Sequence, residues 1–195
     1  MLATEGVPED MYPNPNFVKA TLAAFPEKAV ATIEESRALW EQGGYYILDV
    51  RSDFAYDQGK VKGERVVHVP RNLCKTRWDS ATKSRAYDYT PVADWKDKVS
   101  KAIPDKKAKI LVMCADGRTN AIDALEDLDA LGYSCIVGMK GGYGAYSFVF
   151  DNKGARRVHG EYKENYSHGA DTAGIHASGA GFAKMDPKEA VLIIH

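Results

Sequence analysis

Short apolar runs along the chain alternate with longer stretches in which apolar residues recur at helical spacing. The apolar runs predict strands at residues 45–50, 66–70, 109–113 and 136–139. The periodic stretches predict helices at residues 32–42, 53–58, 94–103 and 120–131. Helices that alternate with short apolar strands are typical of α/β proteins, because parallel strands need helical crossovers. The pattern therefore predicts an α/β fold with a mostly parallel sheet covered by helices on both faces.

The first predicted helix and the strand after it have clear boundaries. Thr32 opens the helix, two glutamates follow in its first turn, and Gly43 and Gly44 close it. The strand then ends beside Asp49 and Arg51, where its carboxyl end meets a loop. We therefore expect these two polar side chains at the carboxyl edge of the sheet.

Two other stretches have no such pattern. Residues 71–91 are polar and aromatic, which predicts a long surface loop. Further along, aromatic residues alternate with smaller ones; these are Tyr143, Tyr146, Phe148 and Phe150. We interpret them as strand-like or as part of the core.

The length and composition predict one domain with extensions at both ends. A chain of 195 residues that is 45% hydrophobic can bury one substantial core, which we place at residues 28–150. Residues 1–27 are expected to form an N-terminal arm, since the prolines there prevent any long regular element: Pro8, Pro13, Pro15 and Pro26. Residues 151–195 are rich in glycine and are expected to form an extended C-terminal tail.

Charge and hydropathy exclude several classes of partner. The formal net charge is -1, with both signs mixed along the chain, which disfavours a nucleic-acid partner. No apolar run reaches the roughly 18 to 20 residues of a membrane span, and the first residues do not resemble a secretory signal. These features favour a soluble protein.

The cysteine and histidine spacings predict neither disulfides nor a metal site. Cys74, Cys114 and Cys135 lie far apart in sequence, which favours a reducing compartment. The tail contains histidines whose separations match no compact ligand pattern: His159, His168, His176 and His195. We expect no metal.

Cys114 is the strongest candidate for chemistry, because it directly follows a buried strand and precedes a helix. The backbone N–H groups of such a turn and the helix dipole would stabilise a thiolate over a thiol. Gly117 permits the tight turn, and Arg118 could donate to an oxyanion. The alternative is a small apolar cysteine that fills the end of a core strand.

Four segments in order resemble the rhodanese-like sulfurtransferase family, over about residues 28–150. They are Leu48-Asp-Val-Arg51, Gly59-Lys-Val-Lys-Gly63 followed by Val69-Pro70, Cys114-Ala-Asp-Gly-Arg-Thr119, and Met139-Lys-Gly-Gly142 with Tyr146. The resemblance implies a rhodanese-like fold with a mostly parallel five-stranded sheet.

The same resemblance implies a mechanism that needs no metal or organic cofactor. Cys114 would take sulfane sulfur from a thiosulfate-like donor as a persulfide and pass it to a thiol acceptor or cyanide. The loop that binds the substrate and holds the persulfide would be formed by Ala115, Asp116, Gly117, Arg118 and Thr119. Asp49 and Arg51 would brace this loop. Cys74 or Cys135 could resolve the persulfide as a disulfide.

The loop departs from the family pattern in two ways. The family places arginine sixth in the loop, whereas Arg118 is fifth, so we expect its guanidinium to be displaced or to point outward. Asp116 adds a negative charge that raises the pKa of a nearby thiol and repels an anionic donor. Both departures predict a slow or specialised enzyme. A phosphatase loop would need arginine six places after the cysteine, where this chain has Asn120, which disfavours phosphatase activity.

The alternative function is a catalytically weak rhodanese-fold subunit that binds a larger complex through its N-terminal arm and C-terminal tail. The early arginine, the Asn14-Pro-Asn-Phe17 lead-in and the Phe150-Asp-Asn-Lys153 segment resemble chloroplast rhodanese-like proteins of plants and algae. This resemblance implies a chloroplast location, in the stroma or at the thylakoid, with a thylakoid photosynthetic complex as partner.

Overall fold

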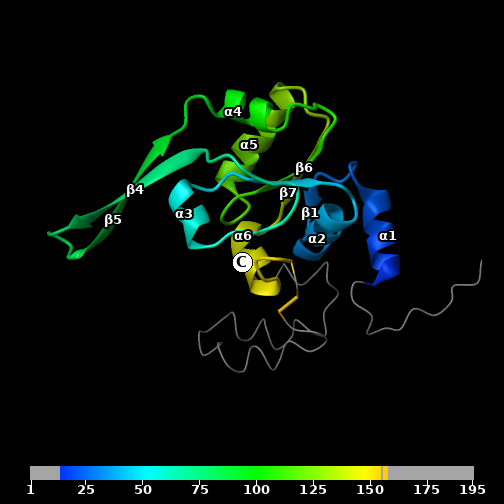
Figure 1. Cartoon of the computed structure of the whole chain (residues 1–195), viewed down its shortest axis with the longest axis horizontal. Helices are drawn as coiled ribbons and strands as arrows, with labels where there is room; N and C mark the ends of the chain where they lie inside the picture. Colours follow the sequence, from blue (N-terminus) through cyan, green and yellow to red (C-terminus); the bar gives the residue numbers. More distant parts are fainter. Residues whose placement is uncertain (1–13, 155, 158–195) are drawn as a thin grey trace, which may run out of the picture.

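The computed structural model describes residues 14–154 and 156–157. Its centre is a five-stranded sheet in the order β1-β7-β6-β2-β3 (Figure 1). The strands are β1 (Val30–Ala31), β2 (Tyr46–Asp49), β3 (Val66–His68), β6 (Lys109–Met113) and β7 (Cys135–Met139). Every neighbouring pair in this sheet is parallel, which confirms the predicted sheet.

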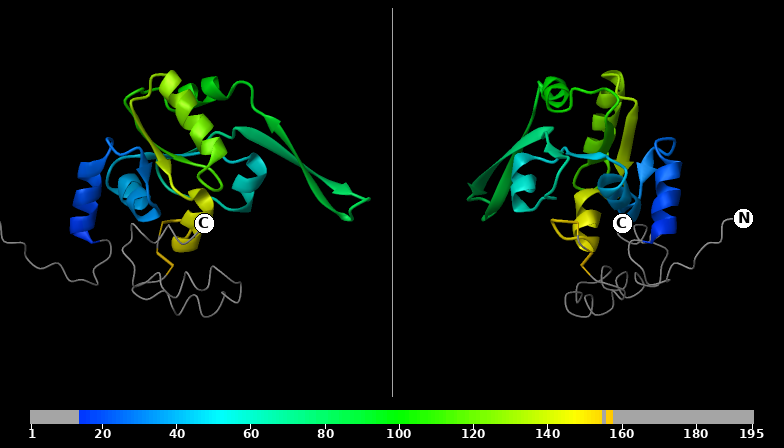
Figure 2. Two further views of the ribbon diagram at one scale, coloured as in Figure 1. Left: turned by 180° about the vertical axis from the view of Figure 1, so that it is seen from behind. Right: turned by 45° about the vertical axis from the view of Figure 1, so that its right-hand side comes forward.

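Helices cover both faces of the sheet, as predicted (Figure 2). They are α1 (Pro15–Ala24), α2 (Ile33–Glu41), α3 (Asp53–Gln58), α4 (Trp95–Ala102), α5 (Thr119–Ala130) and α6 (Gly142–Val149). The α2 and α6 helices bury their apolar sides against one face, and α4 and α5 against the other. In the part of the chain that the structure describes, no helix is long and apolar enough to cross a membrane.

The central strand β6 shows why the sheet has two cores. Its side chains alternate, so Leu111 and Met113 enter the core with α2 and α6, while Ile110 and Val112 enter the core with α4 and α5. All four are fully buried. A continuous apolar run is what a parallel strand needs when both of its faces are covered.

The start of α2 is also as predicted from sequence. The Thr32 hydroxyl accepts a hydrogen bond from the Glu35 N–H at 3.3 Å, and the Glu35 carboxylate accepts one from the Thr32 N–H at 3.0 Å. This reciprocal capping box satisfies two N–H groups that the first turn would leave without a helical partner.

The expectation that prolines keep the N-terminal arm irregular is wrong for α1. Pro15 is the first residue of that helix, where its missing N–H costs nothing. The Asn14 side chain caps the helix by accepting from the N–H groups of Asn16 and Phe17, at 2.9 and 3.3 Å. Val18 is buried, so α1 packs on the domain.

Residues 71–91 are not the predicted surface loop, and they form an antiparallel hairpin. Its strands are β4 (Asn72–Asp79) and β5 (Ser84–Pro91). Figure 1 shows the hairpin as a long arm that extends beyond the rest of the domain. The run is rich in residues that favour strands, namely threonine, tyrosine and tryptophan, but it lacks a continuous apolar face.

Tyr143, Tyr146 and Phe148 lie in α6, so their strand-like interpretation is wrong. Phe150 follows the helix and forms an isolated antiparallel bridge with Arg156. Tyr146 and Val149 on α6, and Phe150 just after it, are buried in the core that α2 also contacts. The alternative interpretation as core packing is confirmed for these aromatic residues. Tyr143, Tyr146 and Phe150 are spaced as one face of a helix requires. Most of the predicted tail, residue 155 and residues 158–195, lies outside the described residues.

Candidate active site at the carboxyl edge of the sheet

Cys114 lies at the carboxyl end of the central strand β6. It is 1% exposed and packs within the core formed with α4 and α5. Met113, just before it, pairs with Asp49 on the neighbouring strand β2. The end of β2 and the cysteine loop therefore meet at one edge of the sheet, as the sequence predicted.

The loop after β6 folds back so that its backbone faces the sulfur. The Gly117 N–H donates a hydrogen bond to Cys114 Sγ at 3.1 Å. The Asp116 carboxylate accepts from the Arg118 N–H at 3.0 Å, and its Oδ1 atom lies 3.5 Å from the thiol sulfur. The loop therefore places both a donor and a carboxylate beside Cys114.

Gly117 is required at the tightest point of this loop. Its φ of +72° lies in the left-handed region, which side chains disfavour. A Cβ atom there would also lie 2.6 Å from the Gly141 backbone nitrogen and 2.7 Å from the Met139 carbonyl oxygen. The loop is thus packed directly against the segment that leads into α6.

The first residues of α6 hold the cysteine loop through its carbonyl groups. The Tyr143 N–H donates to the Cys114 carbonyl at 2.7 Å, and the Gly144 N–H donates to the Ala115 carbonyl at 3.0 Å. A Cβ on Gly142 would lie 2.3 Å from the Cys114 carbonyl oxygen. The sequence signal for this contact was the glycine pair at 141–142.

Burial dominates the electrostatics of the thiol. It raises the pKa of Cys114, and the backbone N–H groups of Asp116, Gly117 and Arg118 partly oppose this effect. The hydrogen bond to the Asp116 side chain raises the pKa further. The expectation that the turn favours the thiolate is correct for the backbone contribution, but desolvation outweighs it.

Asp49 and Arg51 form a buried ion pair behind the loop. The Arg51 Nη2 and Asp49 Oδ2 atoms are 2.6 Å apart, and Arg51 Nε also donates to the same carboxylate. The guanidinium donates to the carbonyls of Ala55 and Gly59, at 3.2 and 2.8 Å, and so contacts the middle and the carboxyl end of α3. Its carbon lies 3.7 Å from the centre of the Tyr143 ring. The pair therefore reaches the cysteine loop through Tyr143.

The side chains of Arg118 and Thr119 point to a different environment from that of the thiol. Both residues are exposed at the start of α5. Within the described part of the chain, the Arg118 guanidinium makes no hydrogen bond or ion pair. Of the five predicted loop residues, Asp116 and Gly117 contact the sulfur, whereas Ala115 contacts α6 through its carbonyl.

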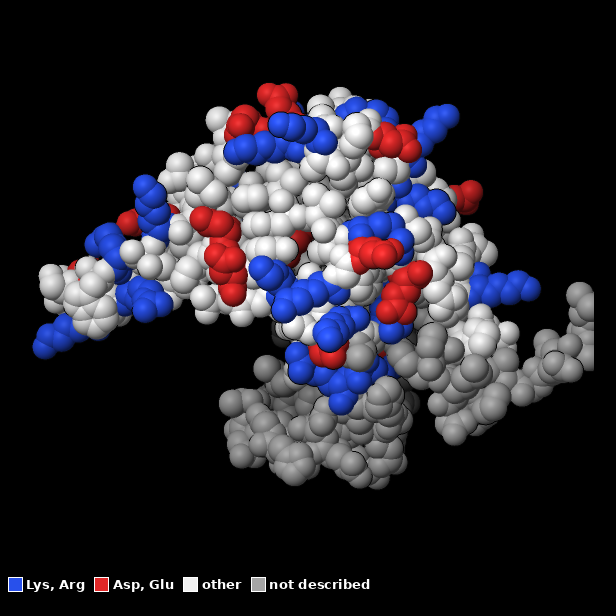
Figure 3. All heavy atoms as spheres, viewed as in Figure 1, with Lys and Arg blue, Asp and Glu red and all other residues white. Residues whose placement is uncertain are grey.

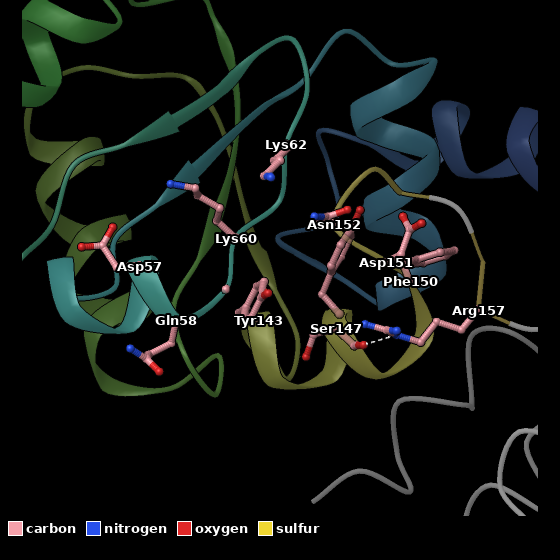
Figure 4. Close-up of a pocket in the computed structure, with 12 residues that line it drawn as sticks. Asp57, Gln58, Lys60, Lys62, Tyr143, Ser147, Phe150, Asp151, Asn152 and Arg157 are labelled. Carbon is pink, nitrogen blue, oxygen red and sulfur yellow. Dashed lines mark hydrogen bonds between the residues drawn. The ribbon is translucent and has the colours of Figure 1, made fainter. Parts of the chain in front are cut away.

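A pocket of about 500 Å³ lies beside this site and was not predicted (Figure 4). It is bounded by the α3–β3 connection and by α6, and Tyr143 lines its wall. Basic side chains around it belong to Lys60, Lys62 and Arg157. Tyr143 therefore lies between the cysteine loop and the pocket. Its N–H holds the loop, and its side chain borders the pocket.

Cys135 cannot resolve a persulfide on Cys114. It begins β7 and pairs with Lys109 at the amino end of β6, whereas Cys114 follows the carboxyl end. Five residues of strand separate the two ends, about 16 Å at the usual rise, and a disulfide needs Cα atoms within about 7 Å. Among the described residues no cluster of histidine, cysteine or acidic side chains could hold a metal ion, and the four tail histidines lie outside them.

Comparison with known proteins agrees with this architecture. The model of the rhodanese-like domain matches residues 32–148. Rhodanese-like domain-containing protein 10 of Arabidopsis thaliana is 27% identical over 127 residues, covering 58% of this chain and 58% of the relative. This chain thus spans little more than half of that relative's length.

Two solved rhodanese-like domains are similar to part of this chain at low identity. That of an Anabaena protein is 18% identical with a TM-score of 0.44, covering 62% of this chain and 74% of its own. One from Staphylococcus aureus is 20% identical with a TM-score of 0.40, covering 61% of this chain and 90% of its own. Because the family match extends over more than half of the residues and includes both β2 and the cysteine loop, the chain belongs to the rhodanese-like domain family.

Proposed function

We propose that this protein is a sulfurtransferase or persulfide carrier that moves sulfane sulfur through Cys114. The observation that carries the proposal is the hydrogen bond from the Gly117 N–H to a buried sulfur at the end of a central strand. A donor in this position stabilises negative charge on sulfur in a site that excludes most water.

The proposed reaction has two displacement steps and needs no external oxidant. The Cys114 thiol loses its proton to solvent, and the thiolate attacks the outer sulfur of a thiosulfate-like donor. A sulfur–sulfur bond forms to Cys114 as the donor's own sulfur–sulfur bond breaks, and sulfite leaves with the electron pair. An acceptor thiolate then attacks the outer sulfur of the persulfide and releases the Cys114 thiolate.

Different residues around the loop would stabilise the sulfur, keep the loop closed and bind the donor. The Gly117 N–H would stabilise the thiolate and then the persulfide, and the α6 N–H groups would keep the loop closed. Asp49 and Arg51 would act as positioning residues through Tyr143. Arg118 would meet an anionic donor from the exposed side of the loop, with Thr119 beside it.

The test is intact-mass analysis of the purified protein after incubation with thiosulfate. Wild-type protein should gain one sulfur, about 32 Da, that a thiol reductant removes. Cys114→Ser should gain nothing, whereas the matched control Cys135→Ser should gain the same sulfur as wild type. An unmodified wild-type protein, or a Cys114→Ser variant that still gains the mass, would contradict the proposal.

A second function is a rhodanese-fold interaction subunit with weak or no catalysis. The observations that favour it are the raised pKa of Cys114 and the absence of an Arg118 contact to the sulfur among the described residues. In this case the N-terminal arm and C-terminal tail would clasp a larger complex, such as a thylakoid photosynthetic assembly. Co-purification of a stable complex that is lost when residues 158–195 are deleted would support this function.

We also propose a chloroplast location, in the stroma or on the thylakoid. The support is the resemblance of the Cys114–Thr119 loop and of the segments that flank the domain to chloroplast rhodanese-like proteins. Immunodetection in fractionated source cells tests this: signal in stroma or thylakoid fractions is expected, and signal confined to the cytosol would overturn it.

A further inference from the structure

We propose that the β4–β5 hairpin binds an extended acidic segment of a partner protein, which adds as a strand along β5. This surface lies outside the cysteine loop, and the proposal does not depend on sulfur transfer. It rests on three properties of the hairpin: an exposed aromatic face, an unpaired strand edge and an excess of basic side chains.

One face of the hairpin collects its aromatic residues. Directly opposed residues in an antiparallel pair point to the same face. This aromatic face is built from three opposed pairs: Cys74 with Tyr89, Thr76 with Tyr87, and Trp78 with Arg85. Trp78 is 69% exposed and Tyr89 is 61% exposed. Clustered aromatic side chains that remain in contact with water are typical of binding surfaces.

The backbone of β5 offers unused hydrogen-bonding groups on the same stretch. The Val92 N–H donates to the Arg71 carbonyl at 2.8 Å, which makes that pair a hydrogen-bonded one. Hydrogen-bonded and non-hydrogen-bonded pairs alternate along an antiparallel ladder. The outward groups of β5 therefore belong to Arg85, Tyr87 and Tyr89.

The contacts at the hairpin base agree with this alternation. On β4, the outward N–H of Cys74 donates to the Asp53 carboxylate of α3 at 2.7 Å, so the body of the domain covers the base of that edge. No backbone hydrogen bond reaches the outward groups of β5 within residues 14–154 and 156–157. An open strand edge of this kind is a template for another strand.

The excess of positive charge on the hairpin favours an acidic partner. Residues 72–91 contain four basic and two acidic side chains, in a chain of net charge -1. One pair is internal, since Arg77 and Asp88 are 3.0 Å apart. Lys75, Lys83 and Arg85 have no ion pair among the described residues. Figure 3 shows basic side chains along the exposed surface of the arm that β4 and β5 form.

An extended polypeptide fits this combination better than a lipid surface. A strand supplies both N–H donors and carbonyl acceptors for the β5 edge, whereas a lipid headgroup lacks the regular donors. Alternate side chains of the strand would lie on the aromatic face, and acidic ones would meet the unpaired cations.

The bound segment would lie close to the cysteine loop. Phe54 of α3 packs on Tyr87 with ring centres 5.4 Å apart, so the hairpin base is fixed to the domain. The Asn72 side chain donates to Asn120 at 3.4 Å, in the first turn of α5 just after the loop. A partner on β5 would therefore lie near the residues that directly follow the cysteine loop.

The test uses a fluorescent eight-residue peptide of alternating valine and glutamate, the length of β5. Fluorescence anisotropy with the full chain should show saturable binding that weakens as ionic strength rises. The same peptide with N-methyl groups on alternate residues keeps every side chain but loses strand pairing, and should bind at least about tenfold more weakly. A peptide of alternating valine and lysine should not bind.

Protein variants test the aromatic face and the basic side chains separately. Trp78→Ala with Tyr89→Ala should weaken binding at least about tenfold, and so should Lys83→Glu with Arg85→Glu. Ile122→Ala removes another exposed apolar residue, from α5, and should change affinity less than about twofold. The Lys83→Glu change sits in the turn between the strands, so it tests charge without altering the ladder.

Three results would overturn the proposal. The first is equal binding of the N-methylated and unmodified peptides, and the second is unchanged binding by both hairpin variants. The third is binding to anionic phospholipid vesicles through Trp78 and Tyr89 with no binding to the peptide, which would make the hairpin a lipid-contacting element.

Discussion

The cysteine loop and the β4–β5 hairpin are neighbours that differ in packing: the loop is tightly packed within the domain, and the hairpin is largely exposed to water. The loop is packed against α6 so closely that a single Cβ on Gly117 or Gly142 would collide with backbone atoms. The hairpin leaves Trp78 and Tyr89 in contact with water and contacts the domain mainly at its base. Contacts within the domain hold the cysteine loop in place, whereas the hairpin presents an exposed surface on which we propose that a partner binds.

The largest predicted difference is in the loss of unfolding free energy when the ion pair of each region is broken. Asp49→Ala leaves the Arg51 guanidinium buried without its partner and should lower the free energy of unfolding by about 3 to 5 kcal/mol. Asp88→Ala breaks the exposed Arg77 pair of the hairpin and should cost no more than about 1 kcal/mol. Urea unfolding of both variants measures this, and equal losses would contradict the comparison.

A second prediction concerns two glycines that share a positive φ but not their surroundings. Gly117→Ala should destabilise by about 1 to 3 kcal/mol and reduce persulfide formation at least about tenfold, because its Cβ meets backbone atoms. Gly132 has a φ of +83° with no atom within 4 Å of the added carbon. Gly132→Ala should cost only about 1 kcal/mol and keep persulfide formation. Loss of persulfide formation in both variants would argue against a specific role for the loop.

A third prediction follows from the raised pKa of Cys114. The reactive thiolate forms as pH rises, so the rate of persulfide formation should increase with pH to a plateau above the usual cysteine range. Asp116→Asn removes the carboxylate that raises this pKa, so the profile should shift to lower pH. A stopped-flow pH series on both proteins measures it, and a shift to higher pH would contradict the assigned direction.

The smallest predicted effect belongs to the exposed hairpin. Trp78→Ala should change the free energy of unfolding by less than about 0.5 kcal/mol, because its side chain is largely hydrated. Trp95→Ala removes a buried tryptophan at the start of α4 whose indole N–H donates to the Val69 carbonyl, and is expected to cost about 3 to 5 kcal/mol. A large loss from Trp78→Ala would mean that the hairpin stabilises the domain rather than presenting a surface.

Sequence patterns were most informative where a local rule and burial agreed. The apolar run at 109–113 predicted β6, and Thr32 with the glutamates predicted the start of α2. Pro15 misled the prediction because proline forbids the interior of a helix but suits its first position. The aromatic residues after Gly142 misled it because both strand and helix can bury such residues, and only packing on α2 selects the helix.

The candidate site was predictable to a similar extent. The strand–cysteine–glycine order placed Cys114 at the carboxyl edge of the sheet, and the end of β2 placed Asp49 and Arg51 beside it. The link through Tyr143 and the neighbouring pocket were not predictable, because residues far apart in sequence create them. The net direction of the Cys114 pKa also depends on burial, which a local motif does not specify.

The sequence by itself determined the α/β class, the positions of the central strands along the chain and the place of Cys114 after a buried strand. These features depend on local periodicity and turn chemistry. Only the tertiary structure decided that Cys135 faces the opposite end of the sheet, that α6 clamps the loop, and that residues 72–91 leave the domain as a hairpin. Those outcomes depend on contacts between segments that are far apart in sequence, and the local preferences of any one segment do not specify such contacts.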